Sequence, residues 1–205
     1  LHNDIDTMEK TAEDIRKLAV SILNDPSTVQ VDPIAPVKTV SHALYPVPDA
    51  LKKNLLLAML QQTPTARALI FTRTKHRARN LALDLSKLKY RVSALQGNLS
   101  QNRRDEAMNG FRSGKYDILV ATDIAAHGID VPEISHVINF DMPDTADAYI
   151  HRIGRTGRAL QTGEAFTLAV EADAPMVREV EKVLQSPIER RRFPDFNHRC
   201  FRPDT

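Results

Sequence analysis

The stretch YDILVATDIAAHGIDVP, residues 116–132, decides the fold. Its first six residues are mostly apolar and rich in strand formers, which is typical of a buried parallel strand. Thr122 and Asp123 follow the predicted strand, and open α/β sheets bind ligands at the carboxyl ends of their strands. Gly128 and Asp130 come a few residues later, in a predicted loop. The stretch therefore predicts a parallel sheet with a binding site at one edge.

A second stretch, HRIGRTGR at residues 151–158, is rich in arginine and glycine. Arg152, Arg155 and Arg158 are three apart, which on a helix places them on one side. Guanidinium groups stay charged and their planar forks match phosphate oxygens, while glycine lets a ligand approach the backbone. The pattern favours a cluster that meets a polyphosphate. The alternative is a solvated basic helix face.

A third stretch, GNLSQNRRDEAMNGF at residues 97–111, predicts a helix that begins after Ser100 as its N-cap. Arg103 and Arg104 fall in its first turn. Taken alone, the stretch equally fits an ordinary amphipathic helix whose apolar residues Ala107, Met108 and Phe111 face a core.

Strands and helices alternate along the chain, which indicates βαβ units and a parallel, doubly wound α/β sheet in one domain. The strands are expected near residues 39–45, 67–72, 92–95, 116–121, 134–140 and 163–170. The helices are expected near residues 48–62, 75–88, 100–112, 144–152 and 173–184.

In this order and spacing, the stretches resemble the C-terminal RecA-like domain of DEAD-box ATP-dependent RNA helicases. ALIFTRTK at 68–75 is similar to motif IV, SQNRR at 100–104 contains the Gln-x-x-Arg signature, VATDIAAHGID at 120–130 is similar to motif V, and YIHRIGRTGR at 149–158 is similar to motif VI. The tail resembles RhlE-like bacterial members. The resemblance implies a single RecA-like lobe, a parallel sheet with helices on both faces.

The resemblance also assigns roles to residues. It implies arginine fingers at Arg155 and Arg158, which reach the γ-phosphate of ATP. His151 matches a residue that couples motif VI to the carboxylates of the first lobe. Gly128 and Asp130 match positions near the ribose. The RNA-contacting positions, which bind single-stranded or duplex RNA without reading its sequence, are Thr74, Gly97, Arg104 and Thr122. ATP and Mg²⁺ are the cofactors implied for the complete enzyme.

Three positions depart from the family pattern: His127 replaces arginine, Gln96 histidine, and Asn98 aspartate. Histidine is mostly neutral near pH 7 and is too short for a bidentate fork. Two readings stay open, neutral drift in a working enzyme and weakened coupling between RNA and ATP.

The sequence contains neither a Gly-x-x-x-x-Gly-Lys-Ser/Thr phosphate loop nor an Asp-Glu-Ala-Asp run. We therefore expect the second half of a helicase, which alone holds no cofactor, hydrolyses no ATP and needs the missing N-terminal lobe as partner. The alternative is a non-catalytic RNA-binding or regulatory half-helicase module. A DNA helicase is a weaker rival, because motif VI begins with His151 where those enzymes often carry glutamine.

Four segments are expected: a first-lobe remnant with helix and edge strand at 1–31, a linker at 32–38, the RecA-like domain at 39–185, and a basic, loosely ordered tail at 186–205. The linker contains Pro33 and Pro36, which cannot donate backbone hydrogen bonds. We expect Arg190, Arg191 and Arg192 to act as a diffuse RNA tether.

Composition favours a soluble, cytoplasmic protein. The formal net charge is only +2, so any nucleic-acid surface must come from local patches. The single cysteine, Cys200, excludes an intrachain disulfide, and the seven histidines lack metal-ligand spacing. No apolar run approaches the roughly 20 residues of a membrane span, so neither a membrane nor a metal is expected as a partner.

Overall fold

The computed structural model describes residues 40–62, 67–126, 134–157, 163–194 and 196. Contacts divide the chain into two units, Leu1–Ile34 and Ala35–Thr205, and the described residues all belong to the second. The predicted helix and edge strand at 1–31 and the predicted linker at 32–38 lie outside the described residues. The division of the chain into four segments stays a prediction.

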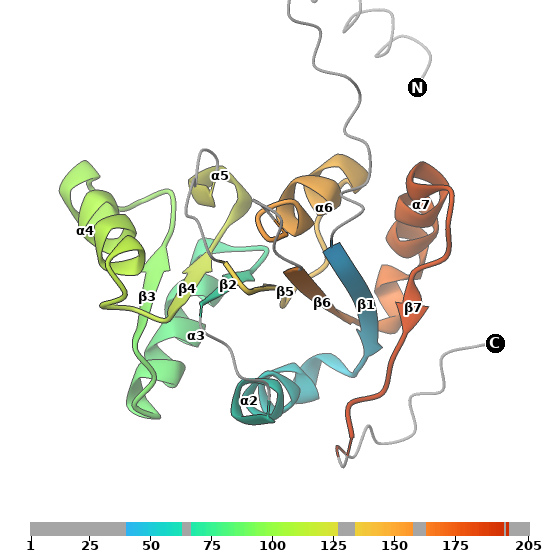
Figure 1. Cartoon of the computed structure of the whole chain (residues 1–205), viewed down its shortest axis with the longest axis horizontal. Helices are drawn as coiled ribbons and strands as arrows, with labels where there is room; N and C mark the ends of the chain where they lie inside the picture. Colours follow the sequence, from blue (N-terminus) through green and yellow to red (C-terminus); the bar gives the residue numbers. More distant parts are fainter. Residues whose placement is uncertain (1–39, 63–66, 127–133, 158–162, 195, 197–205) are drawn as a thin grey trace, which may run out of the picture. The chain divides into compact units, whose positions relative to one another are not determined.

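Strands and helices alternate as predicted (Figure 1). The described strands are β1 (Val40–Pro46), β2 (Ala68–Phe71), β3 (Val92–Leu95), β4 (Ile118–Ala121), β5 (His136–Asn139), β6 (Gly163–Ala169) and β7 (Glu189–Arg190). The described helices are α2 (Lys52–Gln62), α3 (Lys75–Lys87), α4 (Gln101–Arg112), α5 (Asp123–Ala126), α6 (Ala146–Ile153) and α7 (Ala174–Leu184), with 3-10 turns at Asp49–Leu51 and Glu171–Asp173. The short helix α5 and strand β7 were not predicted.

The strands form one sheet in the order β3-β4-β2-β5-β6-β1-β7, and every described pairing is parallel. The central strands β2, β4 and β5 are buried at every position. Two-sided burial explains why β2 and β4 are continuous apolar runs rather than alternating ones. The predicted parallel α/β sheet with helices on both faces is confirmed.

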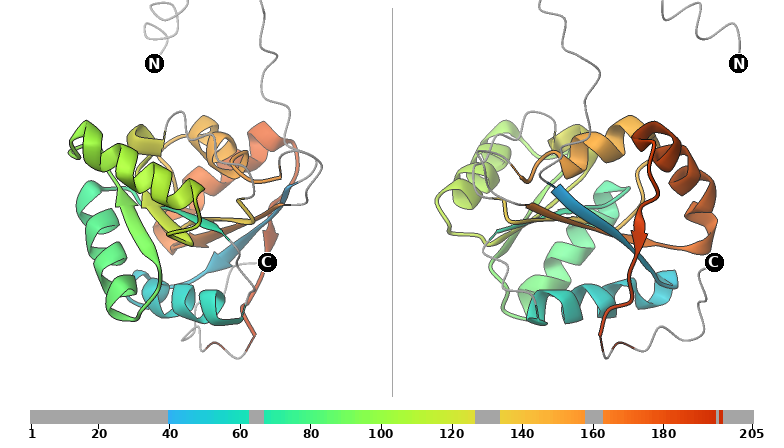
Figure 2. Two further views of the ribbon diagram at one scale, coloured as in Figure 1. Left: turned by 60° about the vertical axis from the view of Figure 1, so that its left-hand side comes forward. Right: turned by 45° about the vertical axis from the view of Figure 1, so that its right-hand side comes forward.

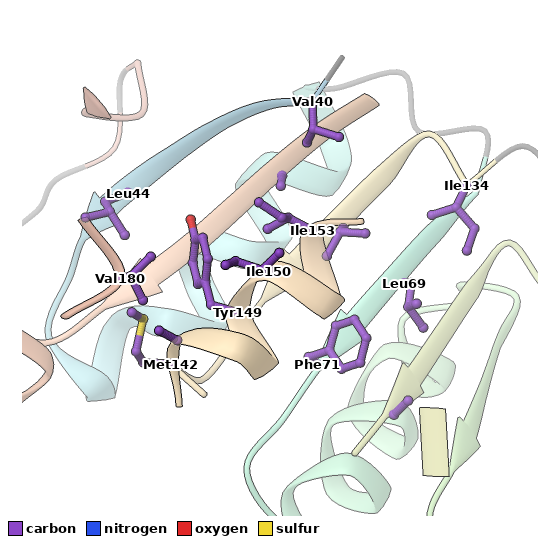
Figure 3. Close-up of a cluster of buried hydrophobic side chains, with 14 of the residues drawn as sticks. Val40, Leu44, Leu69, Phe71, Ile134, Met142, Tyr149, Ile150, Ile153 and Val180 are labelled. Carbon is purple, nitrogen blue, oxygen red and sulfur yellow. The ribbon is translucent and has the colours of Figure 1, made fainter. Parts of the chain in front are cut away.

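The two faces of the sheet have separate hydrophobic cores. Helices α2 and α3 cover one face, and α4, α5, α6 and α7 cover the other (Figures 1 and 2). In α6, the side chains of Tyr149, Ile150 and Ile153 point toward the strands (Figure 3). Burial raises the pKa of Tyr149 to about 12, and its hydroxyl lies 3.1 Å from Nδ1 of His42.

The expectation of a loosely ordered tail is wrong for its first residues. Strand β7 pairs with β1, and Ile188 is only 2% exposed. Arg190 forms an ion pair with Glu181 on α7, and Arg191 with Glu189. A two-residue strand has too little periodicity to be seen in sequence. The sheet therefore continues beyond the predicted boundary at residue 185.

Candidate functional site

The loops that carry the predicted RNA-contacting residues leave neighbouring strands at the carboxyl edge of the sheet. The amide of Thr72 donates to the carbonyl of Ala121 at 2.9 Å, and that of Thr122 to Leu95 at 3.3 Å. These bonds continue the ladder past the ends of β2, β4 and β3. The sheet thus brings together the segments that follow the three strands, as their parallel direction predicted.

Thr74 is exposed and caps helix α3. Its Oγ1 accepts a hydrogen bond from the amide of Arg77 at 3.2 Å. A threonine hydroxyl also carries one hydrogen to donate. The cap therefore fixes the side chain while it leaves the hydroxyl able to donate to a ligand oxygen.

Arg104 lies half-buried on α4 and reaches toward α5. Its Nη2 donates to the carbonyl of Ala125 at 2.6 Å. Helix α4 begins at Gln101, as predicted, although the Ser100 hydroxyl makes no capping bond. Ala107 and Phe111 are buried in the core. Helix α4 is thus amphipathic, and it also positions Arg104. The guanidinium of Arg104 has five N–H donors, so further donors remain beside the one that binds Ala125.

Gly97 follows β3 and is exposed. A Cβ added there would meet nothing within 4 Å, and its φ is not in the left-handed region. The chain itself therefore does not require glycine at this position. Open space over the backbone is what a ligand would need for a close approach.

Arg152 corrects the predicted three-arginine cluster. It is only 2% exposed, and it forms a two-pronged ion pair with Asp123, Nε to Oδ1 at 2.6 Å and Nη2 to Oδ2 at 2.7 Å. Its Nη1 donates to the carbonyl of Asp141 at 2.7 Å and to Oδ1 of Asn139 at 3.3 Å. Its guanidinium also lies 4.9 Å from the centre of the Phe71 ring. Arg152 joins α6 to the segments that contain Asp123, Asn139 and Asp141, and its buried guanidinium is not placed to meet a phosphate.

Sequence could have signalled this burial. Arg152 sits within the stripe of Tyr149, Ile150 and Ile153 that faces the core. The helix ends at Ile153 with Gly154 as C-cap, so the three-residue spacing does not continue on one helix beyond that point. Arg155 instead follows the helix and is half-buried, and His151 is exposed on α6.

The turn after α6 is anchored at Thr156 and Gly157. The buried Thr156 hydroxyl donates to the carbonyl of Ile134, and Gly157 has a φ of +71°. At the start of β6, a Cβ added to Gly163 would lie 2.2 Å from Thr156 Oγ1 and 2.3 Å from the Gly157 nitrogen. Sequence reasoning missed Gly163. Its lack of a side chain lets β6 pack closely against Thr156 and Gly157, in the turn that holds Arg155.

A buried ionic cluster, also missed, supports the segment before α3. Asp141 is 4% exposed; its Oδ2 accepts from the Arg73 amide at 3.0 Å and lies 3.2 Å from Nε of Arg77. Lys52, 2% exposed, reaches Oδ1 of the same carboxylate at 3.5 Å. Burial lowers the pKa of Lys52, against the opposing charges of Asp141 and then Asp173 and Asp49. Lys52, Arg77 and Asp141 come from segments that are far apart in the sequence. Ion pairs between distant segments leave no local pattern, which explains why the sequence did not reveal this cluster.

Three predicted site residues, Gly128, Asp130 and Arg158, lie outside the described residues, as does His127. Within the described ranges, no group of three or more histidine, cysteine, aspartate or glutamate residues could hold a metal ion. The helices searched there include none long and apolar enough to cross a membrane.

The model of the helicase conserved C-terminal domain matches residues 50–160, more than half of the chain. The chain belongs to this helicase C-terminal family. Its relatives include the RNA helicase CrhR of Synechocystis, 42% identical over 86% of this chain and 36% of that protein. Another is the ATP-dependent RNA helicase SrmB of Escherichia coli, 37% identical over 86% of this chain and 40% of that protein.

A solved structure of E. coli DEAD-box protein SrmB, bound to regulator of ribonuclease activity A, has the same fold. It matches with a TM-score of 0.75 at 36% identity, over 82% of this chain and 99% of that one. The helicase C-terminal domain is thus of the DEAD-box RNA helicase type, as its motifs predicted. It spans about two fifths of the length of the curated relatives it matches, and the RhlE-like assignment stays a prediction.

Proposed function

We propose that this chain is the C-terminal lobe of an ATP-dependent DEAD-box RNA helicase, where it supplies half of the RNA-binding surface and the arginine fingers for ATP hydrolysis. The observation that carries the proposal is the Arg152–Asp123 ion pair. Asp123 directly follows the RNA-contact candidate Thr122, and Arg152 precedes the finger candidate Arg155 by three residues. One buried side chain therefore joins the two functional segments.

The RNA half of the proposal rests on Thr74, Gly97, Arg104 and Thr122. Thr74 offers a hydroxyl, Gly97 an open backbone and Arg104 a guanidinium. Thr122 offers a second hydroxyl. Such groups contact sugar and phosphate, so they position a strand without selecting its sequence. Asp141 supports this surface indirectly, because its carboxylate fixes the Arg73 amide next to Thr74.

For ATP, the proposal assigns Arg155 and Arg158 to the γ-phosphate and Asp130, behind Gly128, to the ribose. Positive charge placed on the transferring phosphoryl group stabilises the charge that develops on it. His151 is exposed on α6, so its imidazole can face the other lobe. We assign Mg²⁺ to the N-terminal lobe of the complete enzyme, because this sequence contains no Asp-Glu-Ala-Asp run to hold it.

The joined segments suggest how RNA and ATP influence each other. The turn that holds Arg155 directly follows α6, and Arg152 ties α6 to the segments that follow β4 and β5, through Asp123 and the carbonyl of Asp141. Closure of the two lobes around ATP would thus shift Thr122, which directly precedes Asp123, the partner of Arg152. We propose that this closure bends the bound strand and opens a short duplex locally.

The test compares the 205-residue chain alone with a complete two-lobe helicase that contains it. Alone, the chain should bind single-stranded RNA weakly and release no phosphate from ATP, because positioning by both lobes supplies the catalysis. The two-lobe protein should show RNA-stimulated phosphate release. RNA-stimulated hydrolysis by the chain alone would contradict the proposal. An inactive two-lobe protein, with RNA binding retained, would favour the non-catalytic regulatory module.

A further inference from the structure

The amino edge of the sheet carries a cluster of positive charge that the proposed function does not use. The loops that enter β3, β4 and β2 lie there, and these three strands are neighbours in the sheet. We call the cations of these loops and of the adjoining helix ends the amino-edge cluster: Arg67, Lys87, Lys89, Arg91, Arg112 and Lys115.

The cluster is exposed and only partly neutralised. The side chains of Arg91 and Lys115 are 61% and 60% exposed. Among the described residues, Asp117 pairs with Arg91, and Glu106 lies 3.8 Å from Lys115. Within the part of the chain that the structure describes, Lys87, Lys89 and Arg112 form no ion pair, although the whole chain has a net charge of only +2. The positive potential is therefore concentrated at this edge.

Side-chain hydrogen bonds of two arginines join the loops that carry the cluster. Arg91 binds Asp117 with two nitrogens and donates from Nη1 to the carbonyl of Gly114 at 3.1 Å, which ties the loop before β3 to the loop before β4. Arg67 donates from Nη2 to the carbonyl of Arg112 at 3.1 Å, which ties in the start of β2. Charges on a preorganised surface lose less freedom when they bind a partner.

Stabilisation of helix C-termini by cations explains only part of the cluster. Lys87 and Arg112 lie in the last turns of α3 and α4, where cations offset the negative end of the helix dipole. Lys89, Arg91 and Lys115 lie beyond those helices, in the loops. Lys89 has a φ of 69° and forms no ion pair within the part of the chain that the structure describes.

We propose that the amino-edge cluster is a second contact for the phosphate backbone of RNA, separate from the carboxyl-edge loops. This inference rests on the proposed function, because the partner is the same RNA. Phosphates suit the cluster because it presents several cations and few groups that could read a base. The half-buried Tyr116 ring packs against the core and has Nζ of Lys115 5.2 Å from its centre, so it is poorly placed to stack on a base.

The two contacts are separated by the length of the strands between them. A four-residue strand spans roughly 10 Å or more at about 3.3 Å per residue. A short strand held at the carboxyl edge would not reach the amino edge, whereas a long one could wrap onto it. The amino-edge cluster should therefore matter only for long RNA.

The test uses the double variant Lys89→Gln/Lys115→Gln in the 205-residue chain. Its control, Arg178→Gln/Lys182→Gln, removes two exposed cations from α7. Each protein is titrated with oligoribonucleotides of about six and about thirty nucleotides, which bracket usual single-strand site sizes. Salt is varied from about 50 to 200 mM, and circular dichroism checks that each variant is folded.

For the long RNA, the amino-edge variant should bind roughly tenfold more weakly at about 50 mM salt, and the slope of log K against log salt should flatten by about 1.4, for two lost phosphate contacts. Its binding to the short RNA should match wild type, as should the control on both RNAs. Unchanged long-RNA binding would overturn the inference, as would an equal loss in the control or on the short RNA. If no variant bound the short RNA, the proposed function would fail instead.

Discussion

The last turn of α6 and the turn that follows it use the same residue type in opposite ways. Arg152 is buried, and its guanidinium is held by Asp123, Asp141 and Asn139. Arg155 lies beyond the helix end, half-buried, in a turn anchored by Thr156. Within one arginine-rich stretch, the position relative to the helix end rather than the spacing thus decides which arginine side chain is buried.

The largest expected effect comes from Arg155→Ala in a complete two-lobe helicase that contains this chain. Turnover of ATP should fall roughly a thousandfold or more, which corresponds to about 4 kcal/mol of transition-state stabilisation. RNA affinity without nucleotide should change little. Steady-state hydrolysis and RNA titration measure the two effects, and Arg178→Ala on α7 is the control. Equal losses in turnover and RNA affinity would assign Arg155 to RNA or to the fold.

Arg152→Ala should show the reverse pattern, a loss of stability in the chain itself. Removal of one partner of a buried pair costs about 3 kcal/mol or more, and we expect the lower end because Asp123 is 44% exposed. Urea unfolding gives the free energy of unfolding. Arg152→Lys should recover only part of the loss, since lysine cannot form the two-pronged pair. If the Arg152→Ala protein were as stable as wild type, the structural role assigned to Arg152, in contrast to Arg155, would be contradicted.

Sequence predicted the sheet far better than the contacts that hold the site. Four-residue apolar runs and regular helix spacing are local signals, and β2, β4 and α3 appeared where they were expected. The roles of Lys52 and Asp141 depend on the fold, because an ion pair between distant segments leaves no periodic trace. Arg152 was misjudged because its charge outweighed the apolar stripe around it. A buried, fully bonded arginine and a ligand-binding one look alike in sequence.

Two glycines provide a matched test of the turn after α6 that holds Arg155. Gly163→Ala would place a Cβ 2.2 Å from Thr156 Oγ1 and 2.3 Å from the Gly157 nitrogen. The turn must shift, at a cost of about 1–3 kcal/mol for overpacking, and turnover in the two-lobe protein should fall with it. Urea unfolding and ATP hydrolysis measure these two effects.

Gly97→Ala is the control, because an added Cβ meets nothing within 4 Å. The free energy of unfolding should stay within about 0.5 kcal/mol of wild type, as for other surface changes. RNA affinity should fall if a phosphate approaches the Gly97 backbone. Equal destabilisation by the two substitutions would mean that Gly163 does not set the turn.

The smallest effect concerns Glu181, whose ion pair with Arg190 is partly exposed and docks β7. Its hydrogen bond with Arg190 is the main cause that lowers its pKa below the usual 4.5, and the Ile188 amide, which donates to it at 2.8 Å, acts in the same direction. Because the folded pKa is the lower one, the stabilisation is present above pH 4.5 and is lost as pH falls through the folded pKa. Glu181→Gln should therefore cost about 1 kcal/mol at pH 7, and urea unfolding at decreasing pH should show this difference shrink in the acid range. A constant difference across pH would mean that the carboxylate charge does not hold β7, which would place Arg190 with the exposed cations rather than with Arg152.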